Sequence, residues 1–222
     1  LDAVYQTHGV VNIMDANADG DDLLLNGKRF PLLRQQAAKL KKDDPFLCLS
    51  DFVRPLSSGI TDKIGAFATT VDAEMEQLYA EDDYKRMLAQ TLSDRLAEAT
   101  AEKLHEDVRK KLWGYAPDEN LSVKDLHNEK YQGIRPAVGY PSLPDQSINF
   151  LLDELLDMKQ IGISLTENGM MKPHASVCGL MFAHPASHYF SIGKIGEDQL
   201  ADYAARRGMS IEETKKFLAA NL

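Results

Sequence analysis

One loop of this sequence carries side chains that could hold a small charged ligand. The segment reads Tyr131-Gln-Gly-Ile-Arg-Pro-Ala-Val-Gly-Tyr-Pro141, so Arg135 directly precedes a proline and follows a glycine turn. Proline fixes its own backbone angle and restricts the residue before it, which stiffens the chain around Arg135. A guanidinium held in this way can bind a carboxylate through two parallel hydrogen bonds. The residues after it could line a flat aromatic ligand with backbone groups and the Tyr140 ring, although an arginine beside a loop proline is, on its own, more often a plain surface residue.

A second segment imitates the beginning of a calcium-binding loop. Asp15-Ala-Asn-Ala-Asp19-Gly20 alternates oxygen ligands and has a glycine at the sixth position. The twelfth position is Asn26, where bidentate coordination requires glutamate, and a strand rather than a helix is expected to precede the loop. A polar turn is therefore favoured over a calcium site.

The remaining residue types that could do chemistry form no recognisable site. His184 and His188 are separated by Pro185, so the helical spacing of metal ligands does not apply to them. The sequence has no Gly-x-Gly-x-x-Gly, Gly-x-x-x-x-Gly-Lys or Gly-x-Ser-x-Gly pattern. Cys48 and Cys178 lie far apart without Cys-x-x-Cys spacing, which predicts two buried, reduced thiols. We expect no catalytic residue and no metal ligand on this chain.

The elements that must position the Arg135 loop begin with a strand-rich first third. Short apolar runs predict strands, and the first two are joined by a polar, glycine-containing turn typical of a hairpin. Apolar residues at helical spacing that end in lysines predict one helix. The expected strands are Gly9–Met14, Asp22–Leu25, Phe46–Leu49 (which leads into Asp51) and Ile64–Val71, and the expected helix is Phe30–Leu40.

A long helix is the clearest element in the sequence. Between about Asp72 and Leu112, apolar residues recur every fourth position and predict one apolar stripe. Their positions are Leu88, Leu92, Leu96, Leu104, Val108 and Leu112. The acidic residues 81–83 could divide the segment into two helices. The other face carries Asp94, Glu98, Glu102 and His105, which we interpret as a solvated face.

The second half adds an irregular loop, one more hairpin and the last helices. Asn128–Pro144 is rich in glycine and proline and is expected to be irregular. The other expected elements are a helix over Gln146–Gln160, strands at Ser176–Ala183 and Tyr189–Ile195, and helices from Glu197 to Arg207 and from Ser210 onward. This order indicates an α+β fold with a largely antiparallel sheet and packed helices. Because no linker or repeat divides the chain, residues 1–222 are expected to form a single domain.

Composition and charge argue against membrane and nucleic-acid partners. The 222 residues are 44% hydrophobic and 27% charged, which is typical of a globular protein and not of a disordered one. No apolar run approaches the roughly 20 residues of a membrane-spanning helix, and the N-terminus does not resemble a signal peptide. The formal charge of −9 would repel nucleic acid and anionic membranes. We therefore expect a cytoplasmic protein without nucleic-acid or membrane partners. Because the first residue is Leu1, we expect a processed chain or a piece of a longer protein.

The pattern Arg135-x-x-x-Gly139-Tyr140 resembles the Arg-x-x-x-Gly-Tyr motif of the activation domain of vitamin B12-dependent methionine synthase. Further blocks resemble that family in the same order, and together they cover nearly the whole chain from about Gly9. These blocks are Cys48-Leu-Ser-Asp-Phe-Val53, Ile64-Gly-Ala-Phe-Ala68, Asp94-Arg-Leu-Ala-Glu-Ala99, Trp113-Gly-Tyr-Ala-Pro117, His184-Pro-x-Ser-x-Tyr189, and Asp198-Gln to Gly208-Met-Ser210.

The resemblance implies a function. In this family the cobalamin, carried on a separate module, is occasionally oxidised to an inactive form. The activation domain then presents S-adenosylmethionine as the methyl donor for reductive methylation of cob(II)alamin, which restores methylcobalamin. The implied partners are the cobalamin-binding module of the same enzyme and a flavodoxin-like reductase. The implied fold is a curved, C-shaped α+β architecture with the ligand in a shallow groove.

The resemblance also implies site residues. Asp51 should bind the ammonium group of the ligand, and Arg135 should bind its carboxylate, since charge-assisted hydrogen bonds are about twice as strong as neutral ones. The rest of the pocket is implied at Ala137, Tyr140, Tyr189 and Phe190. An aromatic ring could meet the sulfonium through a cation–π contact. Glu98 and Glu129 match acidic residues near the family's site, either in the pocket or behind it.

Two departures and two alternatives remain. The family's domain usually begins with a further helical segment, inside which this chain is expected to start, and the loop Pro141–Ser147 differs from the family's pattern. The cobalamin, homocysteine and folate modules are absent from these residues, so the isolated chain is expected to bind ligand without turnover. One alternative is a docking module for the cobalamin domain and reductase that has lost the ligand. The joint presence of Asp51 and Arg135 favours ligand binding, and a hydrolase has no nucleophile.

Overall fold

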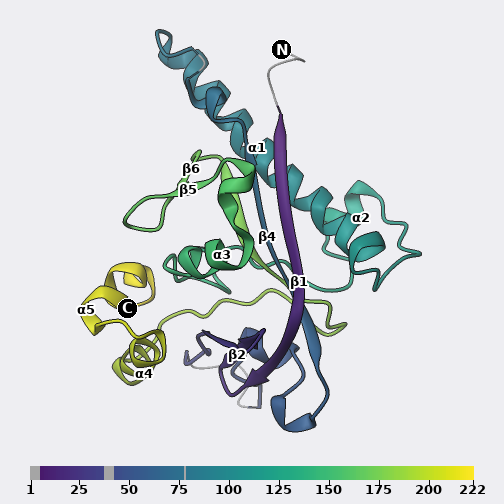
Figure 1. Cartoon of the computed structure of the whole chain (residues 1–222), viewed down its shortest axis with the longest axis vertical. Coiled ribbons are helices and arrows are strands. Elements are labelled where there is room, and N and C mark those ends of the chain that lie inside the picture. The colour runs from purple at the N-terminus through teal and green to yellow at the C-terminus, as the bar shows by residue number, and fades with distance from the viewer. Residues whose placement is uncertain (1–5, 38–42, 78) are drawn as a thin grey trace.

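A five-stranded antiparallel sheet organises the chain, in the strand order β3-β2-β1-β4-β7. The computed structural model describes residues 6–37, 43–77 and 79–222. The strands are β1 (Thr7–Asp19), β2 (Asp22–Leu25), β3 (Lys28–Pro31), β4 (Asp62–Val71) and β7 (Ser176–Met181). β1 pairs with β4 from Thr7 opposite Val71 to Ala16 opposite Asp62, and its final residues pair with β2. Figure 1 shows β1 bending as it passes from one partner to the other, which curves the sheet.

Helices pack on both faces of this sheet. β4 alternates its side chains: Ile64, Ala66 and Ala68 belong to the main core with α3 (Ile148–Leu156), whereas Phe67 packs with α1 (Asp83–Asp107). Successive side chains of a strand point to opposite faces, so α1 and α3 cover opposite sides. The predicted α+β fold with an antiparallel sheet is confirmed.

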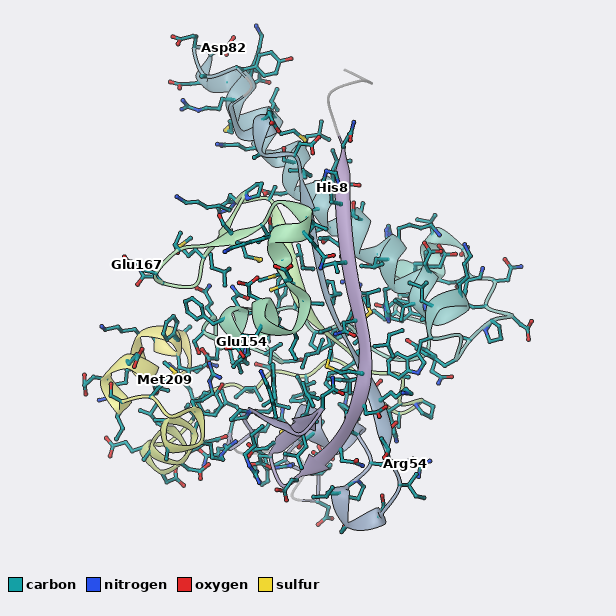
Figure 2. The ribbon with its side chains drawn as sticks, viewed as in Figure 1. His8, Arg54, Asp82, Glu154, Glu167 and Met209 are labelled. Carbon is teal, nitrogen blue, oxygen red and sulfur yellow. The ribbon has the colours of Figure 1, made fainter. Side chains whose placement is uncertain are left out.

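The most buried positions of α1 lie one residue beyond the predicted leucine ladder. Ala89, Ser93, Ala97, Ala101 and His105 are buried at four-residue spacing. Of the predicted stripe, Leu88, Leu92 and Leu112 are exposed, whereas Leu96 and Leu104 are partly buried against the core and Val108 is fully buried, so the helix is confirmed and the stripe is confirmed in part. Small side chains let the helix axis lie close to the sheet. The first turns of α1 extend beyond the sheet, with Asp82 at their tip (Figure 2).

Two short helical segments connect α1 to the loop that carries Arg135. The helix continues as a π-helix over Val108–Leu112 and is followed by the short α2 (Val123–His127). Residues 128–147 then contain no helix or named strand, as the glycine and proline content predicted.

The C-terminal part adds a small hairpin and two helices. A small hairpin, β5 (Ser164–Leu165) and β6 (Met171–Lys172), follows α3 and was not predicted. The predicted last helices are confirmed as α4 (Glu197–Arg207), which ends at the expected Gly208, and α5 (Ile211–Phe217), which begins at the expected Ser210. None of the helices within the described ranges combines the length and apolarity that crossing a bilayer requires.

Three predicted elements were wrong because tertiary contacts overrode local pattern. Residues 30 and 31 end β3 and residues 32–37 are not helical; residues 38–40 of the predicted helix lie outside the described residues. Cys48 forms only an isolated bridge to Arg34, and Leu49–Phe52 is a 3₁₀ helix. The segment 189–195 is extended but is not paired with β7, because the amide of Ile192 donates to Pro141 O at 2.9 Å instead.

Candidate functional site

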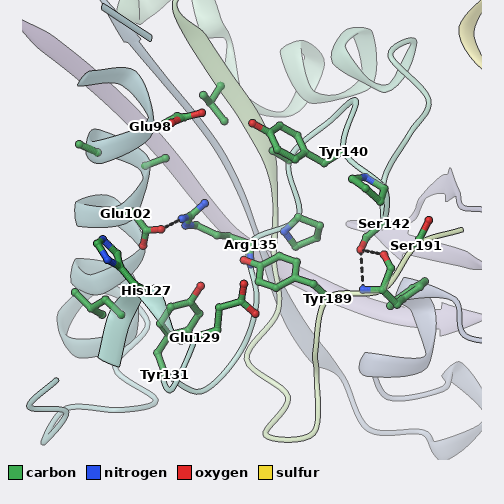
Figure 3. Close-up of a pocket in the computed structure, with 18 of the residues that line it drawn as sticks. Glu98, Glu102, His127, Glu129, Tyr131, Arg135, Tyr140, Ser142, Tyr189 and Ser191 are labelled. Atoms are coloured by element: carbon green, nitrogen blue, oxygen red, sulfur yellow. Dashed lines mark hydrogen bonds and ion pairs between the residues drawn. The ribbon is translucent and has the colours of Figure 1, made fainter. Parts of the chain in front are cut away.

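A cavity of about 890 Å³ lies between α1 and two loops, residues 131–142 and 189–191 (Figure 3). Five of the six predicted binding residues line it, namely Arg135, Ala137, Tyr140, Tyr189 and Phe190. Glu98 and Glu129, the two acidic candidates, line it as well. The fold thus brings together residues that lie far apart in the sequence.

The Arg135 loop is held against the outer edge of β7. Ile134 and Phe182 exchange two backbone hydrogen bonds of 3.0 and 2.9 Å, and Pro136 O accepts from the amide of Leu180 at 3.1 Å. This contact requires glycine at position 179, since a Cβ there would lie 2.2 Å from the carbonyl oxygen of Pro136. The loop is therefore fixed as if it were an additional strand, and Arg135 is fixed with it.

Arg135 enters the cavity with part of its hydrogen-bonding capacity unused. Its backbone amide donates to the Tyr189 hydroxyl at 3.0 Å, and its Nη2 pairs with Glu102 of α1. The side chain is only 17% exposed, and its Nε is buried without a hydrogen-bond partner within the described part of the chain. A buried donor without an acceptor is costly, so this atom marks a place where an anionic ligand group would be stabilised.

Three carboxylates share the cavity with this guanidinium. Glu98 and Glu102 stand one turn apart on α1, and Glu129 follows α2 (Figure 3). Glu98 accepts from Arg95 at 2.9 Å, a pair within one exposed helix face. The predicted solvated face of α1 is confirmed for its acidic side chains, which are partly exposed, and Glu98 and Glu102 also line the cavity; the prediction was wrong for His105, which is fully buried. The one-turn spacing of Glu98 and Glu102 was visible in the sequence, but the pairing of Glu102 with Arg135 was not predicted.

Aromatic rings form the opposite wall. Tyr189 and Phe190 are joined to the loop at Tyr140 through Ser142, whose Oγ accepts from the Phe190 amide at 3.1 Å and donates to the Phe190 carbonyl oxygen. Tyr131 closes the cavity near α1, and burial raises the pKa of its phenol well above the usual range. That hydroxyl therefore stays protonated at neutral pH. The clamp formed by Ser142 was also missed from the sequence.

Asp51 is held by other partners. Its two carboxylate oxygens accept from Arg34 Nη1 and Nη2 at 2.8 Å each, and Oδ2 also accepts from the amide of Cys48 at 2.8 Å. It is not among the residues that line the cavity in the part of the chain that the structure describes. A ligand-binding role for Asp51 stays a prediction, and the geometry gives its carboxylate a structural use.

The arrangement suits binding better than covalent chemistry. Burial raises the pKa of the Cys48 thiol to about 11 and that of Cys178 to about 12, so both stay protonated. Both thiols are reduced and buried, as predicted. Across residues 6–37, 43–77 and 79–222, no three His, Cys, Asp or Glu side chains converge as metal ligands would.

Comparisons with known proteins give a family match and a similar solved structure. Residues 2–208 match the family described as vitamin B12 dependent methionine synthase, activation domain. A solved structure described as the crystal structure of the MetH reactivation domain bound to AdoHcy is similar at 44% sequence identity, with a TM-score of 0.93. The similarity covers 100% of this chain and 72% of that one.

Proposed function

This chain belongs to the family of vitamin B12-dependent methionine synthase activation domains, and on that premise we propose that its cavity binds S-adenosylmethionine as a methyl donor. The similar solved domain is named as bound to AdoHcy, the demethylated product of that donor. A volume of about 890 Å³ lies within the roughly 300–1,000 Å³ range of small-molecule sites. Binding by this chain follows from its own residues.

The unpaired Nε of Arg135 is the observation that carries the proposal. The ligand has an amino acid end, whose carboxylate can accept from Nε and a neighbouring guanidinium nitrogen. Two such charge-assisted bonds fix both the position and the orientation of the group. Arg135 is suited to this role because the backbone of residues 134–138 is already fixed along β7.

The ammonium group of the ligand requires an acidic partner in the same cavity. Glu102 already pairs with Arg135, whereas Glu98 and Glu129 line the cavity from the helix and from the loop after α2. We assign the ammonium group to these two glutamates. Asp51 was the sequence-based choice, but its carboxylate is engaged by Arg34.

The adenosine and sulfonium part fits the aromatic wall. Tyr140 and Tyr189 offer ring faces, and the backbone near Ala137 offers hydrogen-bonding groups. A sulfonium within about 6 Å of a ring centroid gains a cation–π attraction that the neutral thioether of the product lacks. The wall therefore favours the donor over its product.

In this proposal the chain binds and orients the donor, and the reacting cofactor comes from elsewhere. Cobalamin, carried by a separate module, would supply the methyl acceptor, and a flavodoxin-like reductase would supply the electron; the part of this chain is to hold the donor. The cavity residues hold the sulfonium methyl group where that module can reach it. The isolated chain is thus expected to bind the donor without turnover. A cytoplasmic location stays a prediction.

Isothermal titration calorimetry on the chain tests the proposal. We expect one S-adenosylmethionine per chain with a dissociation constant in the micromolar range, and competition by S-adenosylhomocysteine. Absence of saturable binding at millimolar ligand would refute the proposal and favour a docking module that has lost the ligand.

A further inference from the structure

A buried ion pair lies behind the wall of the cavity. The guanidinium of Arg109 is 0% exposed and donates from Nε and Nη2 to the two carboxylate oxygens of Glu119, at 2.8 and 2.6 Å. The Glu119 side chain is only 8% exposed. Burying two charges carries a desolvation penalty that can exceed their mutual attraction, so stability alone does not account for such a pair.

Arg109 is unusual for its place on the helix. It follows His105 by four positions and continues the buried stripe of α1, whose other members are three alanines and a serine. At this point the helix changes to a π-helix, over Val108–Leu112. Such local widening of a helix is frequent at functional sites.

The guanidinium of Arg109 lies over the ring of a cavity residue. Its central carbon is 4.5 Å from the centroid of Tyr131, and Tyr131 lines the cavity. The ring of His105 meets Tyr131 edge-on at 5.1 Å. Burial, together with the charges of Arg109 and Arg135, keeps the pKa of His105 well below its ordinary value, so this ring is neutral. Tyr131 is therefore held by a fixed cation and a neutral ring.

Tyr131 in turn begins the loop that ends in Arg135. Between them, Gly133 has a left-handed backbone with φ of 86°, and a Cβ at this position would lie 2.3 Å from the carbonyl oxygen of Phe182. Because the backbone at Gly133 packs directly against Phe182, the segment has little room to adjust, and a displacement of Tyr131 should also displace Arg135.

We propose that Arg109 is a positioning residue of the ligand site: paired with Glu119, it fixes Tyr131 and so the loop that presents Arg135. The inference rests on the proposed function of the cavity. It assigns to Arg109 no contact with the ligand.

The test removes both charges together. Arg109→Met alone would leave Glu119 buried and unpaired and could prevent folding, whereas the double variant Arg109→Met/Glu119→Leu replaces the pair by apolar groups and is expected to fold. We expect its S-adenosylmethionine dissociation constant to rise about tenfold, equivalent to about 1.4 kcal/mol. The matched control, Arg206→Met/Asp22→Leu, removes a pair that joins α4 to β2 and does not line the cavity, and it should leave the dissociation constant unchanged.

A double-mutant cycle separates positioning from general stability. If Arg109 acts through Tyr131, then Tyr131→Leu should weaken binding, and removal of the ion pair in that background should add little further loss. The inference is overturned if the double variant binds within twofold of the parent, or if its loss adds fully to that of Tyr131→Leu.

A measurement without ligand keeps this test independent of the proposed function. The amide of Ile134 donates to Phe182 O at 3.0 Å, so its hydrogen exchange reports on the loop. We expect exchange at least about tenfold faster in the double variant than in the parent. Should the parent fail to bind S-adenosylmethionine, the proposed function fails, and unchanged exchange at Ile134 would overturn the positioning role separately.

Discussion

Replacing Arg135 with methionine is the perturbation whose effect the structure constrains most. The substitution keeps an unbranched apolar stem but removes every guanidinium donor, including the buried Nε that lacks a partner within the described residues. Glu102 loses its ion-pair partner, yet its side chain is 43% exposed and can be hydrated by water. The unfolding free energy should therefore fall by only about 1 kcal/mol, because the carboxylate that is left behind can be solvated.

The effect on binding should be much larger. Arg135 is 17% exposed, so hydrogen bonds between its guanidinium and a ligand carboxylate form in a site that is mostly shielded from water. A hydrogen bond to a charged group contributes about 1.5–3 kcal/mol. With a factor of ten for about every 1.4 kcal/mol, the dissociation constant of S-adenosylmethionine should rise roughly 10- to 150-fold.

Calorimetry with two ligands and two variants measures this effect. Decarboxylated S-adenosylmethionine lacks the group that Arg135 binds, so Arg135→Met should change its affinity little. Arg86→Met is the matched control, because Arg86 also pairs within α1, with Asp83, but does not line the cavity. Equal losses for the two ligands, or an unchanged affinity for the carboxylated one, would refute the assigned role of Arg135.

Three further predictions concern the packing that supports the site. The pKa of His105 is lowered in the folded state, so below about pH 6.5 the unfolded chain binds one more proton than the folded chain. As the pH is lowered further, the unfolding free energy should decrease by up to about 1.4 kcal/mol per pH unit until the folded-state pKa is reached. Urea unfolding measured from pH 7.5 to 5 should show a flatter profile for His105→Gln than for the parent, and equal slopes would contradict this. Gly179→Ala should lower the unfolding free energy by about 1–3 kcal/mol, because its Cβ would meet Pro136 O at 2.2 Å; an unchanged melting temperature would show that the loop gives way freely. Ser142→Ala removes both side-chain hydrogen bonds to the Phe190 backbone and should weaken S-adenosylmethionine binding about fivefold or more, at about 1 kcal/mol per lost bond, with intact affinity counting against the clamp.

Strands with a clear pattern could be predicted from the sequence, and segments shaped by distant partners could not. β1, β2, β4 and β7 alternate or run apolar between turn signals, and a strand was predicted at each; β1 continues past Met14 to Asp19, through residues that were interpreted as a polar turn, because they pair with β2. Residues 189–195 carry the same kind of pattern, but their backbone bonds to the Pro141 loop instead of to a neighbouring strand. Local sequence contains no information about that partner.

The helix α1 shows a different limit. Its leucines produced the visible periodicity, and Leu96 and Leu104 do pack against the core, but the most buried face is made of alanines and a serine one position further on. Small residues contribute little to a hydrophobic pattern, although they permit the closest packing. The helix could thus be predicted and its exact orientation could not, which is why His105 was interpreted as solvated.

The candidate site was predicted through family resemblance more than through physics. The motif around Arg135, with Tyr189 and Phe190, led to residues that share one cavity. Asp51 could be named as an acidic residue in the right family block, but its pairing with Arg34 depends on how two loops meet in space. Which basic residue pairs with a given carboxylate depends on the tertiary structure.

A crystal structure of the chain with S-adenosylhomocysteine shows directly whether the cavity is the ligand site. We expect the ligand in the cavity of Figure 3, with its carboxylate within hydrogen-bond distance of the Arg135 guanidinium and its adenosine against Tyr140 and Tyr189. Ligand bound at another place, or bound there with its carboxylate away from Arg135, would contradict this expectation.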